Sequence, residues 1–339
     1  MKKTHIVQLD AIRFLAALAV VLYHYTAHDF ETAAAPVTRF GFLGVPFFFI
    51  ISGFVITMSL SGSSSPTKFL IDRAIRLYPS FFFCSVITVG FVAFLTNGPY
   101  FTVYDFFANM TMFGGELHAR RINGAYWSLA VEWMFYFMMF SVFWVIGRKN
   151  LHWFLWVWIA ASGLATIYDL GIVRRLFTLG NAPFFIAGTA IYLIAAGDKS
   201  RWMRALVLFS LPVAIFWEEK NAILAGMEDA IGAIVVALSV VGFYTLIAIV
   251  AHLPRRPSSP KVLEIAGRAS YPLYLLHETI GVHILRSYYE PGLSGFFLVV
   301  GLTLGMIALS FLIAEYIERP AIGWLKRASV RRHLPATSV

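Results

Sequence analysis

The sequence predicts an all-α membrane protein, a polytopic bundle of about ten transmembrane helices with both termini in the cytoplasm. Of its 339 residues, 59% are hydrophobic and only 13% are charged. A soluble domain carries about 45–50% apolar and about 25% charged residues. Apolar runs recur along most of the chain, and a helix needs about 20 apolar residues to cross the hydrocarbon core. Because lipid offers the backbone no hydrogen-bond partners, each run is expected to be helical.

The first apolar run is predicted to be a retained helix. It holds Asp10, Arg13 and His24, and a cleaved signal peptide would not carry such groups inside its apolar region. The predicted limits of the spans are 7–27, 41–60, 80–96, 126–147, 152–169, 177–196, 203–217, 229–252, 270–288 and 295–317.

Lysine and arginine residues set the orientation. The net charge of +9 suggests nucleic-acid binding, but the basic residues lie in short connections between apolar runs. We therefore expect no nucleic-acid partner. With the N-terminus inside, 19 Lys and Arg residues fall in inside segments and 7 in outside ones. This bias predicts that both termini are cytoplasmic.

The chain is predicted to be one domain. Residues 1–320 are expected to form the transmembrane part, and 321–339 a short basic cytoplasmic tail. The inside connection 253–269 is rich in proline and arginine, which is typical of a solvated linker. The longest outside connection is 97–125. The nine histidines fall at no metal-ligand spacing, so no metal site is expected.

Ionisable groups inside the spans are the main functional signal, because each costs about 2.5–3.5 kcal/mol on insertion scales. Arg13 and His24 are eleven residues apart, so they share one helix face with about 16 Å between them along the axis. Asp10 lies near Arg13 by the i, i+3 rule. These three groups either hold helices together as a buried ion pair and a hydrogen-bonded histidine or serve an active site; we favour the second.

Three further sets of polar residues are candidates for a functional role. Arg73 and Arg76 face the same way on a helix and suit phosphate or carboxylate, but they also suit a topology signal or lipid headgroups. Ser128 and Glu132 share a face of the fourth span, where the carboxylate needs a partner such as Arg13. His277, in the middle of the ninth span, fits a structural hydrogen bond as well as an active-site role.

The order of these residues resembles the acyltransferase-3 family of integral membrane O-acyltransferases, which modify O-antigens, exopolysaccharides and similar glycans. The resemblance covers nearly the whole chain, from 9–16 to 318–320. The matching segments between these limits are Gly44 with 47–49 and 52–54, the basic motif at 73–79, 127–129 with Glu132, and 271–277.

The resemblance implies roles at the matching positions. His24 is the presumed catalytic histidine, with Arg13, Glu132 and Asp10 beside it in the catalytic set. Arg73 and Arg76, with Tyr78 in the same motif, are implied to bind the acyl-CoA donor, most often acetyl-CoA in the family. Trp127, Ser128 and His277 are implied to bind substrate. The chain resembles the stand-alone form of the family, located in the bacterial inner membrane and contacting lipid, acyl-CoA and a surface polysaccharide or lipid-linked glycan.

The residues support a mechanism of that kind. Neutral His24 suits a general base for an acceptor hydroxyl, Glu132 or Asp10 an orienting acid, and Arg13 an oxyanion stabiliser. Transfer is either direct or through an acyl group on His24. His24 is expected near the outer end of its span and the arginine pair near the inner end, so the thioester must reach in between the helices.

A different class of function also fits charged residues in spans. A transporter or flippase of a lipid-linked saccharide would place them along its substrate path. Such proteins often show paired repeats and interrupted helices, and the sequence shows neither.

Overall fold

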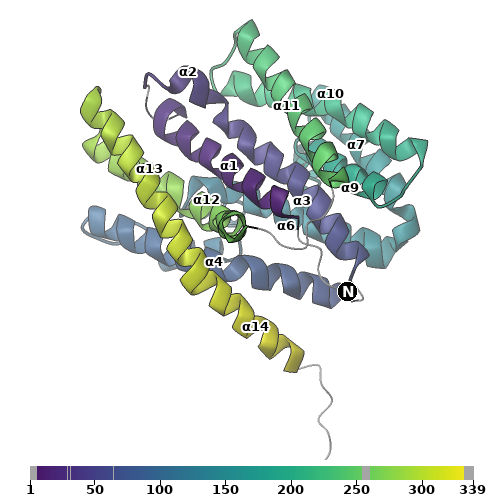
Figure 1. Ribbon diagram of the computed structural model, residues 1–339, viewed down its shortest axis with the longest axis horizontal. Helices are drawn as coiled ribbons and strands as arrows, with labels where there is room; N and C mark the ends of the chain where they lie inside the picture. Colours follow the sequence, from purple (N-terminus) through teal and green to yellow (C-terminus); the bar gives the residue numbers. More distant parts are fainter. Residues whose placement is uncertain (1–5, 29, 31, 64, 254–259, 332–339) are drawn as a thin grey trace, which may run out of the picture.

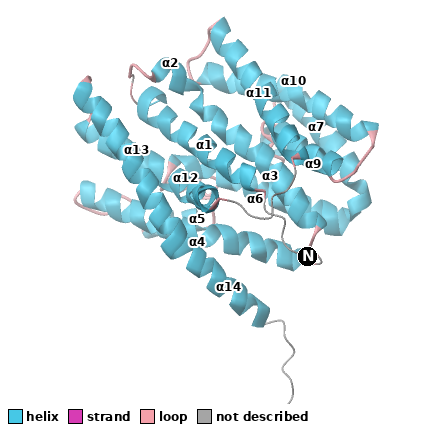
Figure 2. Ribbon diagram, viewed as in Figure 1, coloured by secondary structure: helices cyan, strands magenta, loops and turns pink. Residues whose placement is uncertain are grey.

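The computed structural model describes residues 6–28, 30, 32–63, 65–253 and 260–331. Throughout this part of the chain the regular elements are helices, with no strand (Figure 2). The longer helices are α1 (Val7–Tyr23), α3 (Gly44–Ser61), α4 (Pro66–Leu95), α6 (Trp127–Ser141), α7 (Leu151–Ile167), α9 (Ala182–Ala195), α10 (Arg201–Leu224), α11 (Ala230–His252), α12 (Lys261–Tyr288), α13 (Leu293–Ile313) and α14 (Arg319–Arg331).

Shorter pieces connect or extend these helices. They are η1 (His24–His28), α2 (Ala35–Thr38), η2 (Arg39–Leu43), α5 (Val103–Met110), η3 (Gly124–Tyr126), η4 (Val142–Gly147), η5 (Arg148–Asn150), α8 (Gly171–Leu176) and η6 (Ala314–Glu318). Of these, η1, η4 and η6 are π-helical. Each π-helical piece directly continues a long helix, so it locally changes the phase at which side chains leave that helix.

The prediction of a polytopic helix bundle is confirmed. Six segments of the described chain are long and apolar enough to cross a membrane: Val7–His28, Ala35–Ser61, Thr67–Leu95, Gly124–Ile167, Ala230–His252 and Leu293–Ser329. A shorter apolar helix, Ala182–Ala195, covers most of the sixth predicted span. The count of ten spans and the cytoplasmic location of both termini stay predictions.

Several helices extend further than the apolar runs predict. Helix α4 begins at Pro66, so Arg73 and Arg76 lie within it and not in a connection before residue 80. Helix α12 begins at Lys261, which makes the linker prediction wrong for 261–269; residues 254–259 lie outside the described part. The apolar pattern marks where a helix meets lipid, whereas its backbone hydrogen bonds continue through the polar turn beyond.

The regions predicted as a C-terminal tail and as the longest outside connection also contain helix. Helix α14 runs through most of the expected tail, up to Arg331, and 332–339 lie outside the described residues. The connection 97–125 contains α5, which a reciprocal capping box between Thr102 and Asp105 begins.

Close helix pairs fix the centre of the bundle. Helix α3 packs against both α1 and α9, and α12 packs against α1 (Figure 1). A methyl group on Gly188 of α9 would overlap the carbonyl of Ile50 in α3, and one on Gly267 of α12 would overlap the side chain of Asp10 in α1. Small residues at such crossings let helix backbones approach closely, as is usual in membranes. These contacts hold α1, α3 and α12 around the space described next.

Candidate active site

A cavity of about 760 Å³, its mouth included, lies between α1, α3, α4, α6 and α12. Its polar lining is Arg13, Ser52, Arg73, Arg76, Ser128, Glu132, Tyr136, Ser270, Tyr271 and Tyr274, and its apolar lining is Val45, Phe48, Phe49, Val55, Ile56, Leu77 and Leu129.

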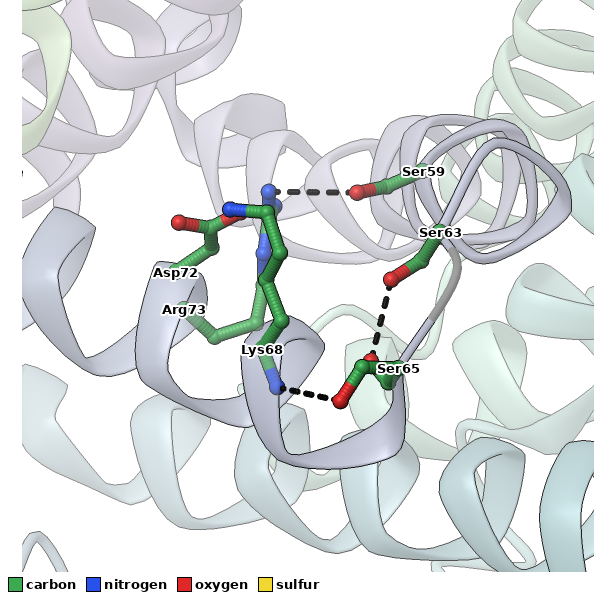
Figure 3. Close-up of polar contacts among 6 residues, drawn as sticks. All are labelled: Ser59, Ser63, Ser65, Lys68, Asp72 and Arg73. Atoms are coloured by element: carbon green, nitrogen blue, oxygen red, sulfur yellow. Dashed lines mark hydrogen bonds and ion pairs between the residues drawn. The ribbon is translucent and has the colours of Figure 1, made fainter. Parts of the chain in front are cut away.

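One end of this cavity is positively charged. Arg13 comes from α1, and Arg73 and Arg76 come from α4; we call these three residues the arginine end. In the described chain none of the three forms a salt bridge. Arg73 Nη2 lies 3.4 Å from Ser59 Oγ at the end of α3. Figure 3 shows this contact. The buried Nε of Arg73 has no hydrogen-bond partner among the described residues. Arginines left without carboxylate partners suit an anionic ligand.

Glu132 is the one carboxylate in the lining. Its Oε1 accepts hydrogen bonds from Ser52 Oγ at 2.9 Å and from the Tyr136 hydroxyl at 2.5 Å. Glu132 and Tyr136 are one helical turn apart on α6, and Ser52 faces them from α3. The two hydroxyl donors hold the carboxyl group in one place in the cavity wall.

The opposite end of the cavity carries hydroxyl groups. Ser128 Oγ and the Tyr274 hydroxyl lie 2.8 Å apart, and each also donates toward the carbonyl of Ala125, at 3.0 and 3.1 Å. The amide of Ala125 donates to Glu278 Oε2 at 2.6 Å. These bonds fasten the start of α6 to the middle of α12. We call Ser128 and Tyr274 the hydroxyl end.

Two histidines lie beyond Tyr274, and neither lines the cavity. The ring of His277 is 5.6 Å from that of Tyr274 and 5.3 Å from that of His24, between centroids. His277 is fully buried. Tyr274 thus lines the cavity and contacts the ring of His277, which in turn contacts the ring of His24.

The structure brings five of the predicted site residues together around the cavity: Arg13, Arg73, Arg76, Ser128 and Glu132. The expected ion pairs of Arg13 with Asp10 or Glu132 are absent from the described chain. Arg13 lies with Arg73 and Arg76 at the arginine end of the cavity. Helix geometry puts it about 16 Å along α1 from His24.

Other predicted residues lie elsewhere. Tyr78 lines a separate groove with Trp133 and Phe137, outside the cavity that its two neighbouring arginines line. Trp127 is 40% exposed and borders a small hollow with Glu116 and Arg121. Asp10 packs at Gly267 and does not line the cavity. Because successive helical residues point about 100° apart, neighbours in a motif need not share a site.

Sequence reasoning left several lining residues unassigned. Tyr136 follows Glu132 by four residues, so the helical repeat that joined Ser128 to Glu132 also reaches it. Ser52 and Tyr274 lie in segments that were recognised but given no role. Among the described residues, no cluster of three or more His, Cys, Asp or Glu side chains could hold a metal ion.

Comparisons with known proteins support an enzyme. A family model described as "Acyltransferase domain", that of the acyltransferase-3 family, matches residues 6–315. "Nodulation protein 10" of Rhizobium leguminosarum bv. viciae is 26% identical, with 96% of this chain and 95% of that protein aligned. "Acyltransferase MdmB" of Streptomyces mycarofaciens is 28% identical over 50% of this chain and 46% of its own length.

A Staphylococcus aureus (strain COL) protein named "Putative O-acetyltransferase" is 24% identical, with 94% of this chain and 58% of that protein aligned. This chain thus matches little more than half of that relative. No solved structure matches the chain. The family model covers almost all of the sequence and every residue that lines the cavity. The chain therefore belongs to the acyltransferase-3 family and is a multi-pass membrane acyltransferase.

Proposed function

We propose that this protein moves an acetyl group from cytoplasmic acetyl-CoA to a hydroxyl of an extracytoplasmic or lipid-linked surface glycan, in the inner membrane of a bacterium. One observation carries the proposal: a single cavity joins three arginines, which form no salt bridge with any described residue, to a hydroxyl end that contacts a histidine pair through His277. A polyanionic donor and a neutral acceptor need such different ends.

The arginine end suits the donor. Coenzyme A carries phosphates, and arginine guanidiniums bind phosphate through paired hydrogen bonds. Arg76 is exposed although it lines the cavity, which puts it at the edge, where a large nucleotide can remain outside. We assign Arg13 to this end as well, in place of oxyanion stabilisation beside His24, because of the distance along α1.

The apolar wall between the ends suits the thioester arm. The lining of α3 runs from Val45 to Ile56, which spans about 16 Å at 1.5 Å per residue. That is about half the hydrocarbon thickness of a bilayer. Phosphates held at the arginine end thus leave the acyl group near Ser128 and Tyr274. This length is comparable to the distance of about 16 Å along α1 between Arg13 and His24.

His24 is proposed as the general base at the histidine pair. It takes the proton of the acceptor hydroxyl as that oxygen bonds to the acyl carbon, the carbon–sulfur bond breaks, and the thiolate of CoA leaves and is protonated from water. Glycan recognition is assigned to the outside connection 97–125 and to Trp127, which follows it. The exposed side chain of Trp127 borders a hollow together with Glu116 and Arg121 of this connection.

Label transfer in membrane vesicles tests this function. Vesicles with the wild-type protein, supplied with acetyl-labelled acetyl-CoA, are expected to label extracted surface glycan, and His24→Ala is expected to abolish labelling. His252→Ala, an exposed histidine at the end of α11, is the matched control. Full labelling by His24→Ala would remove the assigned base. Labelled protein in a rapid quench, lost in His24→Ala, would indicate an acyl-His24 intermediate, and its absence direct transfer.

The same vesicles distinguish the transporter alternative. A flippase would move the lipid-linked saccharide across the membrane without any acyl donor and would not change its mass. The proposed enzyme increases the mass of the glycan by an acetyl group, and only when acetyl-CoA is supplied. Membership of an acyltransferase family favours the enzyme.

A further inference from the structure

His277 of α12 is held by its own helix. It is fully buried, and its Nδ1 lies 2.8 Å from the carbonyl oxygen of Tyr274. Since a carbonyl oxygen can only accept, Nδ1 carries the proton in the neutral ring, and Nε2 is left as an acceptor. This Nε2 is buried and has no hydrogen-bond partner in the part of the chain described. Buried polar atoms without partners are rare in native proteins and call for an explanation.

The ring of His24 lies against the ring of His277. Their centroids are 5.3 Å apart and their planes are inclined by 53°. Rings at this separation bring one nitrogen of each within hydrogen-bond distance when both lie on the facing edges. His24 is also the first residue of the π-helical turn η1, and such turns inside helices are frequent at functional sites.

The backbone around the pair is fixed. The Tyr25 hydroxyl, from the residue after His24, donates to the carbonyl oxygen of His277 at 2.8 Å. A methyl group at Gly281 would overlap that hydroxyl, so the glycine makes this approach of η1 to α12 feasible. The side chain of the residue next to His24 is thus bonded to the backbone of His277, which holds η1 against α12 at the histidine pair.

The acids that the sequence offered as orienters of His24 lie away from it. Glu132 is bonded to Ser52 and Tyr136 in the cavity wall. Asp10 is fourteen residues before His24, about 21 Å along the helix.

We propose that His277 is a positioning residue for His24. Its Nε2 accepts a hydrogen bond from a ring N–H of His24, which fixes the tautomer of His24 and leaves the other ring nitrogen to take the acceptor's proton. When His24 becomes protonated, the same bond stabilises its charge. The inference rests on the proposed function, and it assigns a role to a residue that touches neither the cavity nor the donor.

Two substitutions separate this role from simple packing. His277→Asn keeps an amide N–H near the Nδ1 position, for the bond to Tyr274, and deletes the acceptor. His277→Gln places an amide oxygen near the Nε2 position. The matched control is His283→Asn, because His283 lies on the same helix with Nδ1 2.7 Å from the carbonyl oxygen of Thr279 and is not part of the pair.

Initial rates are measured per amount of protein that elutes as a single folded species in detergent. For His277→Asn we expect kcat to fall about tenfold or more, the size usual for outer-shell partners, with the KM for acetyl-CoA within about twofold of wild type. We expect His277→Gln to recover a substantial part of the loss and His283→Asn to behave as wild type.

The outcomes distinguish this inference from the proposed function. If wild type transfers no acetyl group, or His24→Ala remains active, the proposed function fails. If those two behave as expected and His277→Asn keeps wild-type kcat, only the positioning role is overturned. Equal inactivity of the Asn and Gln variants would overturn the acceptor hydrogen bond, and a loss confined to KM would overturn the assignment to His24.

Discussion

Ser52 of α3 donates a hydrogen bond to Glu132 of α6 across the cavity, with 2.9 Å between Oγ and Oε1. The Tyr136 hydroxyl donates to the same oxygen. These two bonds fix the one negative charge of a lining that contains three arginines. A substitution at Glu132 therefore tests whether this negative charge contributes to catalysis or to donor binding.

Glu132→Gln is expected to lower kcat about tenfold or more without raising the KM for acetyl-CoA. The substitution keeps the shape and removes a charge that repels an anionic donor, so donor binding should hold while the balance of charge around the thioester is lost. Initial rates at varied acetyl-CoA measure both constants. Ser52→Ala, which removes only one of the two donors, should cost less. A raised KM with unchanged kcat would contradict this account.

Arg73→Lys and Arg76→Lys are each expected to raise the KM for acetyl-CoA about tenfold. Lysine keeps the charge but loses the paired N–H geometry that fits phosphate, worth roughly 1.4 kcal/mol for a tenfold change. Acetyl-pantetheine lacks the nucleotide phosphates and provides the decisive comparison, because variants and wild type should then react alike. Arg148→Lys, whose side chain packs over Phe143 and Trp144 away from the cavity, is the control. An equal defect with acetyl-pantetheine would argue against phosphate binding.

Gly188→Ala is expected to destabilise the bundle. Its methyl group would overlap the Ile50 carbonyl where α9 crosses α3, and overpacking typically costs about 1–3 kcal/mol. Gly242→Ala on α11 is the matched substitution, since a Cβ there meets nothing within 4 Å. Thermal unfolding in detergent should show a lower midpoint for Gly188→Ala and an unchanged or higher one for Gly242→Ala. Equal midpoints would mean that the crossing can open without cost.

Asp105 predicts a pH dependence in the connection 97–125. Hydrogen bonds from the backbone and hydroxyl of Thr102 and from the Arg120 amide hold the pKa of the Asp105 carboxyl below its ordinary value of 3.8. A depressed folded-state pKa adds stability above the unfolded value, and this is lost as the pH falls through the folded value.

Hydrogen exchange at the Arg120 amide, corrected for intrinsic rates, measures this loss. In wild type, protection should be constant at pH 5–6 and fall below about pH 3.8. Asp105→Asn should show weaker protection with no such fall. Wild-type protection that stays level down to pH 3 would show that the carboxylate does not order this segment.

The sequence by itself determined the helical membrane bundle, the family and much of the cavity wall. Apolar run length is a local property, so it marked the six segments of the described chain that are long and apolar enough to cross a membrane. The i, i+4 repeat within one helix placed Ser128 and Glu132 on a shared face, and both line the cavity.

Only the tertiary structure decided which faces of different helices meet. Close crossings at Gly188 and Gly267 set the approach of α9 to α3 and of α12 to α1. From that packing it follows that Arg13 joins the arginines of α4, that Tyr78 lines another groove, and that Tyr274 lines the cavity and contacts His277. Helical periodicity gives the direction of a side chain about its own axis, but not the neighbour it faces, because that depends on how closely two backbones approach.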